Sequence, residues 1–352
     1  MNSVDIVQQR AINQQLTGTK FTSAQEIVTW MGAMQAQDYA MVKWAIGIRL
    51  PGSTDAMVEE VINAGEIIRT HVMRPTWHLV SPKDVRWMLA LTAPHLHKAM
   101  KSTRKNLGLT EQILKRSNSI IEKSLIRNGY MTRKELVVEL HRNKINPNNL
   151  QAIHILFNAE LRGTVCNGPM RGKQFTYALF EQRVPQATLL AKDDALAELS
   201  KRYFTSHGPA TLQDFTWWSG LPALEAKISL ESVKSCLVNQ QINGQVFWST
   251  DSVVSEPATK SIYFLPSFDE FMVSYKDRSA SLTPKFLEHV DFGHGIFKPI
   301  IVVNGKVIGI WSREIKKDRI MFKTRFLKSV EKLKKKECNM AFEAYKKFHN
   351  KK

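Results

Sequence analysis

The sequence predicts an α+β fold in which helix-turn-helix units, each closed by a β-hairpin, follow one another along the chain. Two observations predict it. A capping signal followed by two short helices recurs three times, and beyond about residue 256 the sequence changes to strands before a final helix. A third observation concerns the partner: 50 Lys and Arg against 32 Asp and Glu give a formal net charge of +18, which is typical of proteins that bind polyanions, nucleic acid first and anionic membrane second.

In the first copy Ser23 and Glu26 have the spacing of a capping box, in which each side chain satisfies a free backbone N–H of the helix start. The helix that follows is predicted over 24–31. Gly32 is expected to end it.

In the second copy Thr132 and Glu135 form the same box, and the residues at 147–149 break the chain before the periodic helix LQAIHILFNAEL. Gly163 ends that helix. The runs TVCNG and KQFTYALF, joined by the loop GPMRGK, then predict a β-hairpin.

In the third copy Thr211 and Asp214 begin the helix containing DFTWW, and ALEAKISLESV is the second helix. The runs CLVNQQI and QVFWST meet at Asn243-Gly244, a pair that strongly favours a type I′ hairpin turn. Helix, turn, helix and hairpin is the winged-helix layout, in which the second helix can enter a DNA groove and the wing can touch the backbone beside it. Winged-helix units also serve as scaffolds for protein interaction, and the pattern alone leaves that alternative open.

The last part of the chain is predicted to be an antiparallel or barrel-like β module followed by a basic helix over about 326–349. Residues 313–352 hold 15 Lys or Arg against 5 Asp or Glu. The densest run, Lys334, Lys335 and Lys336, either contacts DNA phosphates or forms a solvated helix face. The predicted divisions are 1–108 and 109–188 for the first and second winged-helix units, 189–255 for the third, 256–325 for the β module and 326–352 for the basic helix.

The composition also predicts where the protein works. No run approaches the length of a membrane helix, and the N-terminus lacks the layout of a signal peptide, so we expect a cytoplasmic protein of the bacterial cytosol, associated with the nucleoid. Cys166, Cys236 and Cys338 lie far apart and in no metal-binding spacing. We therefore expect no metal, no cofactor and no membrane partner, and a monomer that binds double-stranded DNA.

Five segments resemble a known family. They are MGAMQAQDYA (31–40), IIRTHVMRPTWHLVSP (67–82), DFTWWSGL (214–221), LPSFDEFMVSYKDRS (265–279) and FKPIIVVNGKVIGIW (297–311). Together they resemble the winged-helix DNA-binding family that includes bacterial DNA glycosylases acting on alkylated purines and interstrand crosslinks. The resemblance implies three tandem winged-helix units around a concave basic surface, with catalysis by a Gln–apolar–Gln motif, here Gln35-Ala36-Gln37. Pro75 stands where relatives have Gly, so the local loop is not expected to be identical.

Two glutamines two residues apart point away from each other on a helix, so Gln35 and Gln37 can cooperate only where the chain is extended. Gly32 permits that, and the pair then lies in the turn before the next helix. Amide side chains are too weakly basic to take a proton from water, but they can hold a water molecule in a fixed attack geometry. Asp38 is expected to cap the next helix, with an electrostatic or base role as the alternative.

Further residues are candidates for DNA contact. Arg69 and Arg74 match phosphate geometry, and His71 and His78 either contact phosphate and polarise the water or are packed inside the fold. Arg171 and Lys173, in the predicted wing, are also expected to contact DNA.

Other sequence patterns give weaker evidence about function. Asp269 and Glu270 form an adjacent carboxylate pair, but neighbours on a strand face opposite ways. Trp217-Trp218 either stacks on bases or belongs to the core. No nucleotide-binding loop, zinc-protease motif or serine-hydrolase elbow is present.

The function predicted is hydrolysis of alkylated or crosslinked purines from DNA by a monofunctional glycosylase. The alternatives are a non-catalytic winged-helix DNA-binding or regulatory protein and a protein-binding scaffold.

Overall fold

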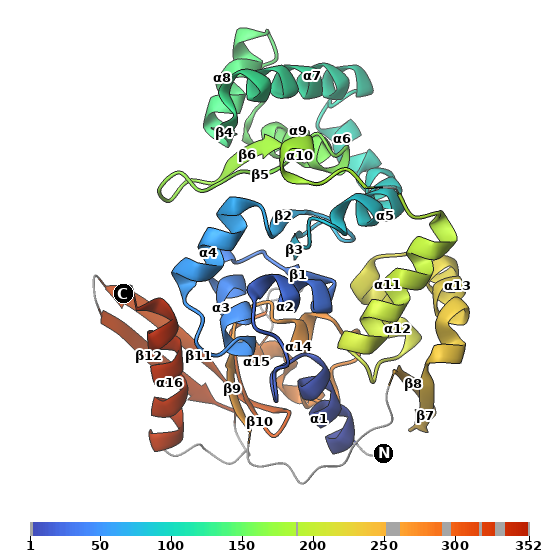
Figure 1. The fold of residues 1–352 in the computed structure, drawn as a ribbon, viewed down its shortest axis with the longest axis vertical. Helices are drawn as coiled ribbons and strands as arrows, with labels where there is room; N and C mark the ends of the chain where they lie inside the picture. The colour runs from blue at the N-terminus through green and yellow to red at the C-terminus, as the bar shows by residue number, and fades with distance from the viewer. Residues whose placement is uncertain are drawn as a thin grey trace. The chain divides into compact units, whose positions relative to one another are not determined.

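A computed structural model describes residues 3–187, 189–250, 261–290, 297–316, 319–327 and 335–350 of the chain. The chain forms two compact units (Figure 1). Unit 1 comprises Met1–Glu59, Ala197–Ser219 and Ala223–Lys352, and unit 2 comprises Glu60–Leu196 and Gly220–Pro222. Helices and strands are mixed in both units, which confirms the predicted α+β class.

Unit 1 contains both ends of the described chain. Its elements are α1 (Ser3–Asn13), α2 (Ala24–Met31), β1 (Ala33–Gln35), α3 (Tyr39–Arg49), α12 (Leu212–Ser219), α13 (Ala223–Val233), η1 (Lys234–Cys236), β7 (Val238–Ile242), β8 (Gln245–Ser249), β9 (Ile262–Leu265), α14 (Glu270–Val273), η2 (Pro284–Phe286), α15 (Leu287–Val290), β10 (Ile300–Val303), β11 (Lys306–Lys316), β12 (Arg319–Phe326) and α16 (Lys335–His349). Two further helices, α4 (Asp55–Ala64) and α11 (Lys192–Ser206), begin in one unit and end in the other.

The predicted C-terminal β module is an antiparallel sheet in the order β12-β11-β10-β9. Asn304 and Gly305 both have positive φ, 48° and 75°, and connect β10 to β11 as the Asn-Gly pair predicts. The helix α16 lies against this sheet (Figure 1). Phe342 stacks on Phe322, and Tyr345 meets the ring of Trp311. Packing of these rings fixes the terminal helix to the sheet.

The predicted start of the terminal helix was wrong. Phe326 lies at the end of β12, where it pairs with Gly309 of β11, and α16 begins at Lys335. The alternation of apolar and polar residues in DRIMFKTRF continues the strand period of two through Phe326.

The third repeated pattern lies in unit 1, and its elements match the prediction. Thr211 and Asp214 form a reciprocal capping pair at the start of α12, with N···O distances of 3.0 and 3.1 Å. Asn243, with a φ of 49°, and Gly244 join β7 to β8. The predicted core role holds for the second tryptophan of the pair, since the Trp218 side chain is fully buried.

Unit 2 contains the second repeated pattern. Its elements are β2 (Ile68–His71), β3 (Trp77–Val80), α5 (Val85–Ala99), α6 (Lys101–Asn106), α7 (Glu111–Asn128), β4 (Tyr130–Thr132), α8 (Arg133–Arg142), α9 (Asn149–Leu161), β5 (Val165–Asn167), β6 (Thr176–Leu179) and α10 (Phe180–Arg183).

The strands of this pattern form a sheet in the order β4-β6-β5, and α7, α8 and α9 share one core with it. The Thr132 and Glu135 side chains make both bonds of the predicted capping box at the start of α8. Asn148 caps α9 in the same way with Gln151, a box that the sequence analysis did not include. Each helix of the pattern thus starts where a side chain satisfies its free backbone N–H groups.

Candidate active site

The Gln35-Ala36-Gln37 segment leaves the helical hydrogen-bond ladder, as its predicted role requires. α2 ends at Met31, and Gly32 follows with a φ of 74°, a conformation that glycine adopts without strain. The chain then forms the short strand β1, which ends at Gln35. The Gln35 side chain keeps 8% of its area exposed, whereas Gln37 is exposed. Gln37 is therefore the more accessible of the two amides.

Asp38 caps α3, as predicted. Its Oδ1 accepts from the backbone N–H of Met41 at 3.1 Å, and the Ser267 hydroxyl donates to Oδ2 at 3.2 Å. The cap fixes the point at which the chain turns from the glutamine segment into α3. Ser267 connects that point to the segment before α14.

Glu270 holds the backbone of the glutamine segment. Its Oε1 accepts from the Gln35 backbone N–H at 2.6 Å, and the Glu270 side chain is 1% exposed. The Ser274 hydroxyl, one turn further along, donates to Oε2. A carboxylate removed from water keeps its charge only where such donors replace the lost hydration.

The neighbouring carboxylate, Asp269, faces a different partner. Its two oxygens each accept from Arg49 at 2.8 Å, and its Oδ1 also accepts from the Phe271 backbone N–H as the N-cap of α14. Arg49 donates in addition to the main chain of Gln14 and Ala45. The end of α3 is thereby joined to the start of α14 by a bidentate ion pair.

His207 lies on the other side of Glu270. Its Nε2 is 3.8 Å from Oε2 of Glu270, and its ring packs against those of Tyr203 and Trp218, which also contact each other. Burial lowers the pKa of His207, although the nearby carboxylate acts in the opposite direction. The imidazole is therefore held neutral beside the carboxylate at neutral pH.

Sequence reasoning did not assign Asp269 or Glu270 to the site because it placed the two on a strand. In the structure Asp269 is the N-cap of α14 and Glu270 is its first residue. The two side chains therefore reach different partners, Arg49 and the Gln35 backbone. The signal was available: Asp followed by Glu and the apolar run FMV is a helix start. Their partners, Arg49 and the Gln35 backbone, depend on tertiary contacts and carry no local signal.

Two of the predicted DNA contacts, Arg69 and His71, have partners inside unit 2. The Arg69 guanidinium, with only 7% of the residue exposed, lies over the rings of Trp77 and Phe175, 4.1 and 4.7 Å from their centroids. His71 Nδ1 pairs with the buried carboxylate of Glu160. These contacts give both side chains a packing role.

His78 is fully buried on β3, so its position corresponds to the packed alternative and not to a surface contact. Arg74 is half-buried, with one guanidinium nitrogen 3.4 Å from Nε2 of His78. Its neighbour Met73 has a φ of 64°, which turns the chain between β2 and β3.

Arg171 and Lys173 are exposed in the loop between β5 and β6, where the wing was predicted. The Arg171 guanidinium donates to Glu135 at 2.7 Å and to the Tyr130 carbonyl at 3.0 Å. Arg171 is thus anchored at the side of the loop, and Lys173 extends into solvent beyond it.

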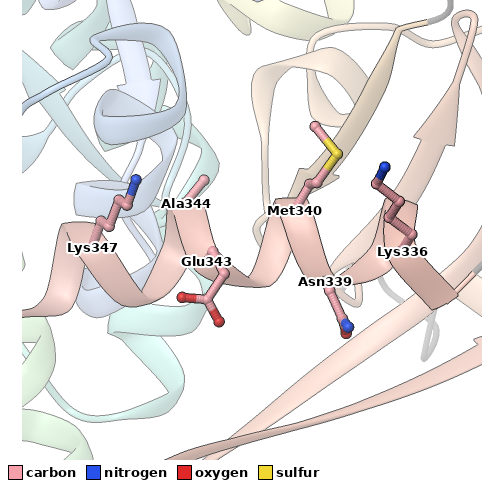
Figure 2. Close-up of a pocket in the computed structure, with 6 residues that line it drawn as sticks. All are labelled: Lys336, Asn339, Met340, Glu343, Ala344 and Lys347. Carbon is pink, nitrogen blue, oxygen red and sulfur yellow. The ribbon is translucent and has the colours of Figure 1, made fainter.

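A shallow, open surface hollow lies on the basic C-terminal helix and is lined by residues of this helix alone. Lys336, which was predicted to contact DNA, lines it together with Met340, Glu343 and Lys347 (Figure 2). In Figure 2 the side chains of Lys336 and Met340 extend to one side of α16 and that of Glu343 to the other. Lys335 is the first residue of α16, and Lys334 lies outside the described residues.

A second basic hollow, of about 610 Å³, lies in unit 2. Lys101, Arg104, Lys105 and Arg162 line it, and the His97 ring borders it. Burial and the adjacent Arg104 guanidinium lower the pKa of His97. The positive charge of this hollow therefore comes from its lysines and arginines, a grouping that the sequence analysis did not single out.

Two kinds of feature are absent from the described residues. No group of three or more His, Cys, Asp or Glu side chains in them is arranged to hold a metal ion. Among the helices that the structure describes, none is both long and apolar enough to cross a membrane.

Comparison with known proteins identifies the family of the chain. The family model described as "DNA glycosylase AlkZ-like" matches residues 28–348. The chain is 23% identical over 321 residues to the "Interstrand DNA cross-link repair glycosylase" of Streptomyces sahachiroi, covering 82% of both chains. The solved structure of the Streptomyces sahachiroi DNA glycosylase AlkZ superposes with a TM-score of 0.84 at 19% identity, over 99% of this chain and 96% of that one. The chain therefore belongs to the AlkZ-like DNA glycosylase family and is a DNA glycosylase by class.

Proposed function

We propose that the protein hydrolyses the N-glycosidic bond of alkylated or crosslinked purines in duplex DNA, with Gln35 and Gln37 placing the attacking water. The printed name of the Streptomyces sahachiroi relative, an interstrand cross-link repair glycosylase, supports crosslinked purines as a substrate class. The reaction uses no covalent enzyme intermediate. We also propose that the protein acts as a monomer and uses no metal or cofactor.

The chemistry suits neutral amides. An N-alkylated purine already carries positive charge, so the bond between C1′ and the purine nitrogen breaks with its electron pair passing to the base. The water oxygen bonds to C1′ and loses a proton to solvent, which leaves a free base and an abasic sugar. The transition state resembles an oxocarbenium ion, which requires a dipole and a placed water more than it requires a strong base.

The observation that carries the proposal is that the Gln35-Ala36-Gln37 segment lies outside the helices: Gln35 ends β1, and Gln37 lies in the bend before α3. Ala36 between them is fully buried, and of the two amides Gln37 is the one that is exposed. The segment is fixed at one end by the Gln35 bond to Glu270 and at the other by the Asp38 cap. Two amides on a fixed backbone can bind one water in a constant position.

DNA binding is assigned to winged-helix units. In unit 2, α8 and α9 followed by the β5–β6 hairpin have the order and sheet pairing of such a unit. The exposed side chains Arg171 and Lys173 on its wing, with Arg74 and Lys336, are the proposed phosphate contacts. Arg69, His71 and His78 are left to packing because of their burial and internal partners.

The test is base release from a duplex that contains N7-methylguanine, with Gln35→Ala and Gln37→Ala compared with wild type at enzyme concentrations that saturate the DNA. We expect both variants to bind DNA as wild type does and to release base more slowly, with the larger loss for the exposed Gln37. A wild-type protein that binds the duplex and leaves both N7-methylguanine and a purine crosslink intact would refute the proposal. Release unchanged in both variants would refute the role of the glutamines.

A further inference from the structure

We propose that Glu270 is a positioning residue for the reaction: its buried carboxylate fixes the backbone from which Gln35 and Gln37 project. The inference rests on the proposed function of the two glutamines. Glu270 is separated from Gln35 by 235 residues in the sequence and touches the segment through a 2.6 Å bond to its main chain. A bond to the main chain sets the directions of both glutamine side chains, because these follow from the backbone.

The type of acceptor argues for a role beyond packing. A backbone carbonyl would satisfy the Gln35 N–H without placing a charge inside the protein, whereas a buried carboxylate costs free energy unless it is fully bonded. An ionised acceptor forms a shorter and stronger bond than a neutral one. The site therefore accepts the cost of a buried carboxylate and gains a strong bond to the backbone that carries the proposed water-binding amides.

The carboxylate is itself held in position. The Ser274 hydroxyl donates to its second oxygen, and His207 Nε2 lies 3.8 Å from that oxygen. On the preceding residue, the bidentate bond from Arg49 to Asp269 fixes the start of α14. The Glu270 carboxylate thus bonds to β1 from helix α14, whose first turn is itself held by the bonds to Arg49 and Ser274.

The experiment compares Glu270→Gln, Glu270→Asp and Glu270→Ala by single-turnover release of N7-methylguanine from a saturated duplex, with DNA affinity measured separately. Gln keeps the reach and one acceptor oxygen without the charge, whereas Asp keeps the charge but is one methylene shorter. Positioning predicts that Glu270→Gln, whose neutral oxygen keeps the reach but makes a weaker bond, releases base more slowly than wild type and faster than the other two variants. It predicts that Glu270→Asp and Glu270→Ala lose roughly ten-fold or more, with affinity unchanged, because small misplacements of a reacting geometry are costly.

Asp214→Asn is the matched control. Asp214 is also fully buried in unit 1 and accepts from three backbone N–H groups, those of Thr211, Lys276 and Asp277. We expect this variant to lower the unfolding temperature and to leave the release rate unchanged below that temperature. An equal loss of rate in Asp214→Asn would mean that general destabilisation, and not positioning, explains the Glu270 variants.

Two results would overturn the inference while leaving the proposed function intact. One is wild-type release by Glu270→Ala when Gln37→Ala is inactive, and the other is a faster rate for Glu270→Asp than for Glu270→Gln, which would indicate a direct electrostatic role. Should Glu270→Ala not fold, Ser274→Ala gives the same readout, since it frees the carboxylate without removing it. Absence of base release by the wild-type protein would remove both proposals together.

Discussion

Arg49 and Asp269, separated by 220 residues in the sequence, form a two-bond ion pair of 2.8 Å each with side chains only 0% and 1% exposed. The pair joins the helix that follows the glutamine segment to the helix that carries Glu270. The two residues of the pair belong to elements that are far apart in the sequence, α3 and α14. The geometry of the candidate site therefore depends on one tertiary bond as much as on local structure.

Removal of one partner of this pair should be strongly destabilising. We expect Asp269→Ala to lower the free energy of unfolding by about 3–5 kcal/mol, because it leaves the Arg49 charge buried without its counterion. Denaturation by urea followed by circular dichroism measures the change. The double variant Arg49→Met with Asp269→Ala should lose less than the sum of the two single variants, and strict additivity would show that the pair contributes nothing.

Gly47 on α3 provides a packing test of the C-terminal helix. A methyl group at this position would lie 2.4 Å from Cε2 of Phe348 on α16. In an exposed helix Gly→Ala stabilises by up to about 1 kcal/mol, but here we expect Gly47→Ala to destabilise by about 1–3 kcal/mol through overpacking. The measurement is the unfolding free energy of Gly47→Ala alone and combined with Phe348→Ala. Stabilisation by the single variant would contradict the packing of α16 on α3.

His207 should make stability depend on pH. Because its pKa is lowered in the folded protein, the unfolded chain binds the extra proton first as the pH falls. The stabilisation is thus present above about pH 6.5, the ordinary pKa of histidine, and is lost as the pH falls below it, by up to about 1.4 kcal/mol per pH unit. The charged groups that act on the ring are Glu270, which raises its pKa, and Arg49 and Arg10, which lower it.

The variant His207→Gln isolates this effect from other histidines with lowered pKa values, such as His97 and His349. We expect the variant to lose less stability than wild type between pH 7 and pH 5. The measurement is the unfolding free energy of both proteins across that range. Parallel curves would show that His207 takes up no proton there.

Substitutions at Asp38 distinguish its role as a helix cap from a role as a catalytic base. Asparagine caps helices as well as aspartate does, so we expect Asp38→Asn to keep both stability and base release. Asp38→Ala should lower the unfolding free energy by about 0.5–2 kcal/mol, since α3 loses the bond to the Met41 N–H. Stability comes from thermal denaturation and activity from release of N7-methylguanine. Loss of release in a stable Asp38→Asn variant would instead assign Asp38 to the chemistry.

The parts of the fold that the sequence predicted are those fixed by neighbouring residues. Ser23 with Glu26 forms the predicted capping box, and Asn243-Gly244 makes the predicted turn. Both signals act within a few residues. The wrong start of the terminal helix arose where lysine-rich sequence has high helix propensity, but pairing of Phe326 with β11 continues the strand.

Of the candidate site, the sequence predicted only the part that lies in one segment, from Gly32 to Asp38. The end of α2 at Gly32, which leaves both glutamines outside the helix, and the cap at Asp38 follow from local chemistry. The bond from Gln35 to Glu270 could not be predicted, because it depends on how distant elements meet. Burial of His78 is a similar case, since alternation along a strand does not reveal which face becomes the core.

Unit 1 is assembled from three stretches of chain, and the last of them ends with α16. Unit 2 is nearly continuous, from Glu60 to Leu196. During synthesis a continuous region can fold as soon as it leaves the ribosome, whereas the glutamine segment must wait for Glu270, about 230 residues later, to acquire its anchor. A nascent chain that has completed the second unit therefore already carries Gln35 and Gln37 but not the carboxylate that bonds to their backbone. On the proposed mechanism, competence for base removal arises only after Glu270 has been made.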